Sequence, residues 1–215
     1  MLTHSQQCLT IHADVTQEPD MQRAVATAVK HFNRIDYAAN FAGISGPLEP
    51  ITDLSLDGWN AAQNVNSTGI FLATKYEMRQ MVSQASIEGV EANRVPQSGS
   101  IVNCASVNSL QTMPTTAAYT ASKHACAGLT KTAALEGRAH NIRVNSVSPG
   151  FLNTSLVAPI GDTELWRGCE RRQGRRAELE EVGDAVVMLS LPRMSLVNGV
   201  NLFIDGGFTV NEGSE

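Results

Sequence analysis

The stretch "GSIVNCAS" at residues 99–106 decides the fold, together with "TTAAYTASKHACAGLTKTAALEGRAH" at 115–140 and "NIRVNSVSPG" at 141–150. The first and third segments are short, rich in apolar residues and end in turn residues, which is typical of strands. The second segment is rich in alanine and has few residues that break helices, so it predicts a long helix. A strand, a helix and a second strand in this order predict a parallel pair of strands.

The same alternation extends to both ends of the chain. Further strands are expected at 9–15, 34–43 and 199–207, and further helices at 18–32, 54–82 and 177–190. This order predicts the α/β class, with helices on both faces of a parallel sheet, in a single domain of residues 1–215. Ligands of such sheets bind at the carboxyl ends of the strands. The residues at those ends are Asp14, Asn40, Ser106 and Pro149–Gly150.

Composition excludes several classes of partner. The net charge of -5 and the pI near 5.5 argue against nucleic acid, because binding phosphates needs a concentrated basic face. The basic stretch "RGCERRQGRR" at 167–176 runs directly into "AELEE", so we expect a solvated loop that leads into a helix. The longest apolar runs, such as "AVVMLSL", are too short to span a bilayer, so no membrane is expected.

The cysteines indicate a reducing compartment. Cys8, Cys104, Cys126 and Cys169 lie far apart with no CxxC pair, which favours neither a disulfide framework nor a zinc site. The first residues, "MLTHSQQCLT", lack a basic segment followed by an apolar run, so no signal peptide is expected. We therefore expect a cytoplasmic protein that holds no metal.

Within "YTASK", Tyr119 and Lys123 stand four residues apart on the predicted helix, so both side chains can point at one pocket. A phenol has a pKa of about 10, and an ammonium within about 4–6 Å lowers it toward the range useful for proton transfer. Such a tyrosine can take a proton from an alcohol as hydride leaves its carbon, or give one to a carbonyl as hydride arrives. By itself the pair is a weak signal, because the spacing also arises by chance.

Two polar residues strengthen this interpretation. Ser106 ends the strand before the helix, where its hydroxyl can bind a substrate oxygen or make only a turn hydrogen bond. Asn66, in "NVNSTG", is an amide inside an apolar helix. It is either a satisfied core residue or, beside Lys123, a group that holds a water and relays protons. Local sequence leaves both pairs of alternatives open.

The chain resembles the short-chain dehydrogenase/reductase family in its single-domain form. The matching segments follow the family order over nearly all of 9–210. They are Asp14-Val15, "NFAG" at 40–43, "VNSTGIFLATK" around Asn66, "GSIVNCAS", "YTASK", "IRVNSVSPGFLNT" and "NGVNLFIDGG". The resemblance implies a Rossmann-like, doubly wound sheet and an NAD(P)-dependent oxidoreductase.

The resemblance also implies roles for individual residues. The catalytic residues would be Asn66, Ser106, Tyr119 and Lys123. Tyr119 would be the acid/base, Lys123 would tune it and hold the nicotinamide ribose, and Ser106 would orient the substrate oxygen. The cofactor would be bound by Asp14, Val15, Asn40, Gly43, Tyr119, Lys123, Pro149, Gly150, Leu152 and Thr154. Local sequence alone equally allows Asp14 and Asn40 to be a helix cap and a turn residue.

The sequence departs from the family pattern at its start. The first βαβ segment of the family, with its Thr-Gly-x-x-x-Gly-x-Gly turn, does not occur, and we expect an N-terminally shortened member that binds cofactor weakly. The same segment contains the strand whose end distinguishes NAD from NADP in the family, so the sequence does not indicate which of the two cofactors is used. The segment 155–177, which covers the substrate in the family, is short, and its Trp166 can pack either on a substrate ring or in the core.

The favoured function is interconversion of a secondary alcohol and a ketone on a small or medium organic substrate, in specialised metabolism. The resemblance of the helices at 54–82 and 115–140 to the family's dimer-forming pair implies a homodimer or homotetramer. Two alternatives remain. One is a non-catalytic relative that serves as a scaffold or binding subunit. The other is a lyase-type relative without hydride transfer, which would replace the lysine that stands here at Lys123.

Overall fold

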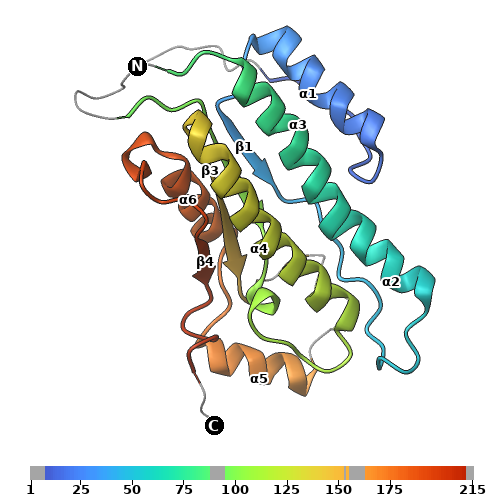
Figure 1. Cartoon of the computed structure of the whole chain (residues 1–215). Coiled ribbons are helices and arrows are strands. Elements are labelled where there is room, and N and C mark those ends of the chain that lie inside the picture. Colours follow the sequence, from blue (N-terminus) through green and yellow to red (C-terminus); the bar gives the residue numbers. More distant parts are fainter. Residues whose placement is uncertain (1–7, 88–94, 153, 155–162, 212–215) are drawn as a thin grey trace.

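The computed structural model describes residues 8–87, 95–152, 154 and 163–211. Within them, one parallel sheet has the strand order β1-β2-β3-β4 (Figure 1). The strands are β1 (Tyr37–Asn40), β2 (Gly99–Cys104), β3 (Ile142–Pro149) and β4 (Asn201–Ile204). The α-helices are α1 (Glu18–Phe32), α2 (Leu56–Gln63), α3 (Gly69–Ser83), α4 (Ala117–Gly137), α5 (Glu164–Gln173) and α6 (Leu179–Ser190).

Helices cover the two faces of the sheet, which confirms the doubly wound α/β fold. Successive residues of a strand point to opposite faces, and Ile101 and Val102 of β2 show the division. Ile101 is fully buried with Met81 of α3 and Ala133 of α4. Val102 is equally buried but packs with residues of α6 on the other face. Each strand of the pair β2–β3 therefore separates two apolar cores.

The helix predicted at 54–82 forms as one rod with an interruption. α2 passes through a π-helical turn, Asn64–Thr68, into α3 without a break in the chain direction (Figure 1). π-turns are rare and place one extra residue in a helical turn, which changes the direction of the side chains near it. The fully buried Asn66 lies at the centre of this turn.

Two expectations of secondary structure were wrong. Residues 9–15 form no strand, because β1 pairs only with β2 among the described residues, and a strand needs a neighbour for its backbone hydrogen bonds. Val15 instead packs on α3, where a Cβ built on Gly69 would lie 3.0 Å from its Cγ2.

The basic stretch expected as a loop is largely α5, although part of the segment 155–177 lies outside the described residues. Thr163 caps the helix by accepting a hydrogen bond from the backbone N–H of Trp166. Glu164 forms ion pairs with Arg167 and Arg171 along one side. Trp166 and Cys169 are buried, whereas Leu165 is exposed, and these two buried side chains define the face that the helix turns to the core.

A buried polar network lies between the sheet and α3. Asn40 and Asn103 are direct neighbours across β1 and β2, and the Asn40 amide donates to Asn103 Oδ1 at 3.0 Å and to Glu77 at 2.9 Å. Asn103 in turn donates to Thr130 of α4 at 3.1 Å. Burial raises the pKa of the Glu77 carboxyl from 4.5 to about 7, and the hydrogen bond from Asn40 opposes this only in part.

The raised pKa of Glu77 makes stability depend on pH. The folded state holds a proton on Glu77 up to about pH 7, whereas the unfolded state releases it near 4.5, so the free energy of unfolding falls between these values as pH rises. Glu77→Gln keeps the acceptor for Asn40 but does not titrate. We expect the free energy of unfolding of this variant, minus that of the wild type, to be up to about 3 kcal/mol larger at pH 8 than at pH 4.

Urea denaturation at pH 4, 6 and 8 measures this difference. Glu136→Gln, at an exposed position of α4, controls for removing a carboxylate from a helix. A Glu77→Gln variant whose stability relative to the wild type is the same at all three pH values contradicts the prediction.

Candidate active site

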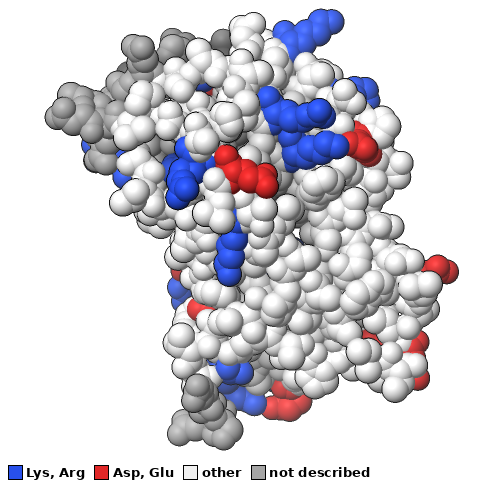
Figure 2. Space-filling model, viewed as in Figure 1, with Lys and Arg blue, Asp and Glu red and all other residues white. Residues whose placement is uncertain are grey.

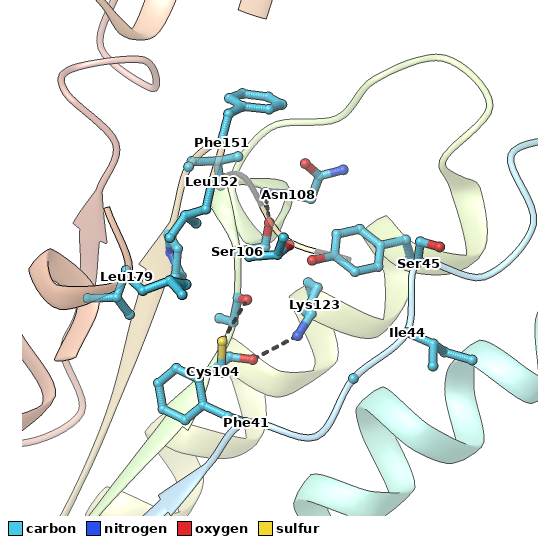
Figure 3. Close-up of a pocket in the computed structure, with 18 of the residues that line it drawn as sticks. Phe41, Ile44, Ser45, Cys104, Ser106, Asn108, Lys123, Phe151, Leu152 and Leu179 are labelled. Atoms are coloured by element: carbon cyan, nitrogen blue, oxygen red, sulfur yellow. Dashed lines mark hydrogen bonds between the residues drawn. The ribbon is translucent and has the colours of Figure 1, made fainter. Parts of the chain in front are cut away.

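A cavity of about 960 Å³ opens at the carboxyl ends of the strands, where the sequence predicted a ligand site. Its wall is assembled from distant parts of the chain: the segment after β1, the end of β2, the first turns of α4, the segment after β3, and α5 and α6 (Figure 3). Three of the four predicted catalytic residues line it together, namely Ser106, Tyr119 and Lys123.

Tyr119 and Lys123 lie one turn apart on α4 and face each other at the cavity. The Nζ atom of Lys123 is 5.5 Å from the centroid of the Tyr119 ring and donates a hydrogen bond to the carbonyl oxygen of Cys104 at 2.8 Å. The lysine is only 4% exposed. The end of β2 thus fixes the ammonium beside the phenol.

The charge state of Lys123 follows from its neighbours. Burial lowers the pKa of the ammonium, but the phenolate of Tyr119 and the thiolates of Cys104 and Cys126, which form only at high pH, raise it by more, so the net direction is upward. Burial also raises the pKa of both thiols, that of Cys126 to about 11, so they are protonated at neutral pH. Lys123 is therefore the cation of this region near neutrality.

Ser106 makes the turn hydrogen bond and also faces the cavity. Its Oγ accepts from the backbone N–H of Asn108 at 3.2 Å, which opens the 3-10 turn Val107–Ser109. The hydroxyl keeps its own proton to donate, because this bond uses only a lone pair. Figure 3 shows Ser106 and Lys123 reaching into the same cavity, the first from the segment after β2 and the second from α4. The two alternatives left open by the sequence are thus compatible.

Asn66 lies behind the cavity and does not line it. Its side chain accepts from the backbone N–H of Ile44 at 2.9 Å and donates to the Ile44 carbonyl at 2.8 Å and to Ser122 Oγ at 3.0 Å. These bonds tie the segment after β1 to α4. A Cβ on Gly43 would lie 3.3 Å from Asn66 Oδ1 and 3.6 Å from Lys123 Nζ, so this amide also sits close to the lysine.

The residues predicted to bind the cofactor divide into two groups. One group lines the cavity: Gly43, Pro149, Gly150, Leu152 and Thr154. The other group does not. Asp14 accepts from the N–H and hydroxyl of Thr16 in a turn, Val15 packs on α3, and Asn40 points into the polar network. Local turn and packing contacts thus hold the second group.

Gln173 is a site residue that sequence reasoning missed. It ends α5, is buried, and pairs with both backbone groups of Phe151: Oε1 accepts from the N–H at 2.7 Å and Nε2 donates to the carbonyl at 3.0 Å. A Cβ on Gly150 would lie 2.0 Å from Oε1, so only glycine fits there. Gln173 therefore fixes the Pro149–Phe151 turn at the cavity wall. Its spacing of seven from buried Trp166 is the signal that marks it.

Three further features of the described residues concern metal ligands, membrane-spanning helices and cysteines. In the part of the chain that the structure describes, no three His, Cys, Asp or Glu side chains gather as metal ligands would. None of the helices described there has the length and apolar character that crossing a membrane requires. All four cysteines are free.

Comparisons with known proteins agree with this geometry. A family model described as enoyl-(acyl carrier protein) reductase matches residues 2–209. The short-chain dehydrogenase srdC of Neurospora crassa is 39% identical over 205 residues, or 92% of this chain and 75% of that protein. The mitochondrial borneol dehydrogenase of Lavandula x intermedia is 35% identical over 206 residues, or 94% of this chain and 74% of that protein.

Solved structures are similar over the same span. The crystal structure of a gluconate 5-dehydrogenase from Burkholderia cenocepacia in complex with NADP and tartrate superposes with a TM-score of 0.82 at 29% identity. The match covers 92% of this chain and 74% of that one. The chain thus spans about three quarters of the length of the relatives that it matches.

Gln173→Met keeps the length of the side chain but removes both hydrogen bonds to Phe151. We expect the free energy of unfolding to fall by about 1–3 kcal/mol, because a buried N–H and a buried carbonyl lose their partners. Chemical denaturation measures this. Gln80→Met is the matched control, since that amide makes one long bond of 3.3 Å to Gln84. Equal losses in the two variants contradict the role given to Gln173.

Proposed function

Because this chain belongs to the short-chain dehydrogenase/reductase family, we propose that it interconverts a secondary alcohol and a ketone with NAD(P) at the cavity formed by Ser106, Tyr119 and Lys123. The observation that carries the proposal is the pairing of a buried, protonated lysine with a phenol on the same wall as a serine hydroxyl. Relatives named as dehydrogenases of alcohols support the CH–OH chemistry.

The residues present fit the nicotinamide half of the cofactor. Gly43 and Gly150 leave backbone without side chains at the wall, and Lys123 supplies a cation that can also hold ribose hydroxyls. Pro149, Leu152 and Thr154 line the same side. The motif Thr-Gly-x-x-x-Gly-x-Gly does not occur in residues 1–215, so we assign no residue to the pyrophosphate.

Three groups divide the work on the substrate oxygen. When bound, the nicotinamide supplies or accepts the hydride at the carbinol carbon. Tyr119 gives its phenolic proton to the ketone oxygen in reduction and takes the alcohol proton in oxidation. Ser106 donates a hydrogen bond to the same oxygen and stabilises the negative charge that develops on it. Lys123 stays charged throughout, because its pKa lies above the ordinary value and its Nζ donates a hydrogen bond to Cys104 O.

Asn66 acts through the segment that it ties down. By holding both backbone groups of Ile44, it keeps Gly43 against Lys123 and closes that side of the cavity. We propose that Asn66 is a positioning residue in the proton relay behind Lys123. Asp14, Val15 and Asn40 remain proposed for the adenosine half, by resemblance alone.

We also propose that the protein is a cytoplasmic homodimer or homotetramer. Free thiols suit a reducing compartment. The face over α4 and α2 carries few charged side chains, as Figure 2 shows in the view of Figure 1. Large apolar side chains are exposed on the two long helices: Phe71 of α3 by 46% and Leu135 of α4 by 67%. A second copy would cover them.

Tyr119→Phe removes the proton donor and keeps the ring. We expect kcat for ketone reduction to fall by about 100-fold or more, which is the usual contribution of a general acid. The rate is followed at the nicotinamide absorbance with a panel of cyclic ketones and NADPH or NADH. Tyr37→Phe is the matched control, because Tyr37 is half exposed on β1 and does not line the cavity.

The outcomes separate the alternatives. Turnover that survives Tyr119→Phe contradicts the proposed chemistry. A folded protein that neither binds the cofactor nor turns over any alcohol or ketone favours the scaffold. Halide release without cofactor favours the lyase-type relative.

A further inference from the structure

Asn108 is a buried amide on the cavity wall that the proposed chemistry does not use. It lies in the 3-10 turn Val107–Ser109 directly after β2 and is 4% exposed. Its backbone N–H donates to Ser106 Oγ, so its position is fixed relative to the hydroxyl that meets the reacting oxygen. Figure 3 shows Asn108 beside Ser106 at the cavity.

The hydrogen bonds of two threonines fix which way the amide points. The hydroxyl of Thr116 donates its proton to the carbonyl of Met113 at 2.7 Å, so this hydroxyl can only accept a hydrogen bond from Asn108. The Nδ2 group therefore lies on that side, donating to Thr116 at 3.4 Å and to Thr120 at 3.0 Å. The opposite orientation of the Asn108 amide would place its Oδ1 against the Thr116 hydroxyl oxygen, which has no proton left to donate.

This leaves the Asn108 carbonyl oxygen as an acceptor at the cavity. Among the described residues, no group donates a hydrogen bond to Oδ1, whereas Nδ2 donates to two threonine hydroxyls. The oxygen is not among the fully enclosed unpaired atoms of the described residues, and Asn108 lines the cavity, so a donor from outside the chain can reach it there.

The rest of the wall indicates what carries that donor. It is mostly aliphatic and aromatic, and Lys123 is the charged residue among the described lining residues. Besides Ser106 and Thr116, which contact Asn108, the wall includes an apolar cluster of Val107, Met113, Phe151 and Trp166. Such a surface favours a hydrocarbon ring and disfavours a sugar acid, whose several hydroxyls and carboxylate would lose water without gaining partners.

We propose that Asn108 is a specificity-determining residue whose carbonyl accepts a hydrogen bond from a second, non-reacting hydroxyl on an otherwise apolar alicyclic substrate. This rests on the proposed function, because the first hydroxyl is the one held by Ser106 and Tyr119. A site that hydrogen-bonds a substrate hydroxyl discriminates strongly against the analogue that lacks it. The substrate class is thus a cyclic diol, or the hydroxyketone that it yields.

The test compares cyclohexanol with the cis and trans isomers of cyclohexane-1,2-diol and cyclohexane-1,3-diol. The Kd of each alcohol is measured by calorimetry with NADP+ and with NAD+ present, and kcat/KM is measured on the same protein. We expect the wild type to prefer at least one diol by about 10-fold or more. Asn108→Leu removes the acceptor, and the ratio of diol to cyclohexanol should fall to about one. Asn108→Asp keeps an acceptor oxygen at the cavity, the Thr120 hydroxyl can turn to donate to its second oxygen, and the preference should persist.

Asn60→Leu, the same substitution at an exposed position of α2, is the matched control and should leave the ratio unchanged. Circular dichroism checks that each variant is folded, and Asn108→Asp decides the question if Asn108→Leu does not fold. Equal Kd values for cyclohexanol and every diol in the wild type overturn the inference, as does a preference that survives Asn108→Leu. Absence of turnover for all alcohols overturns the proposed function instead, while the Kd ratio still decides the role of Asn108.

Discussion

The buried ammonium of Lys123 is the constraint on which the site depends. A cation removed from water needs acceptors close by, and here the Cys104 carbonyl at 2.8 Å and the Tyr119 ring supply them. That requirement fixes the end of β2 against α4 and sets the phenol at the mouth of the cavity. Asn66 and Gly43 close the other side by holding the segment after β1 against the lysine. The contacts that arrange the proposed site are therefore the same contacts that pack this part of the fold.

Polar groups beneath the site follow from the parallel sheet. The register places Asn40 beside Asn103, and strand alternation turns both side chains to the face that α3 and α4 cover. Glu77 completes the network from α3 with a carboxyl that burial keeps largely protonated below pH 7. Each side chain of this network has a hydrogen-bond partner, so the network holds the ends of β1 and β2 in place. The residues that follow these strand ends can therefore line the cavity.

Particular residues show how far sequence reasoning reached. The helical spacing of 18–32 predicted the bounds of α1, and "YTASK" correctly placed Tyr119 and Lys123 on one face of a helix. Reasoning from local pattern was wrong for 9–15, because a strand forms only beside another strand. It was also wrong for α5, because the many charged residues of this segment drew attention away from its N-cap and its buried Trp166. Neither Gln173 nor Asn108 belongs to a recognised motif, because the importance of each depends on which of its polar atoms folding pairs and which it leaves open.

By itself, the sequence determined the α/β class, the order of the elements and the pairing of Tyr119 with Lys123, because these depend on periodicity within a segment. Tertiary structure alone decided which strand-end residues share a cavity. The Asn40 side chain points into the core, and the oxygen and nitrogen of the Asn66 amide bind Ile44 and Ser122. The carbonyl of Asn108 has no donor among the described residues. The physical reason is that a polar side chain takes the partner that folding brings within about 3 Å, and sequence spacing does not encode that distance.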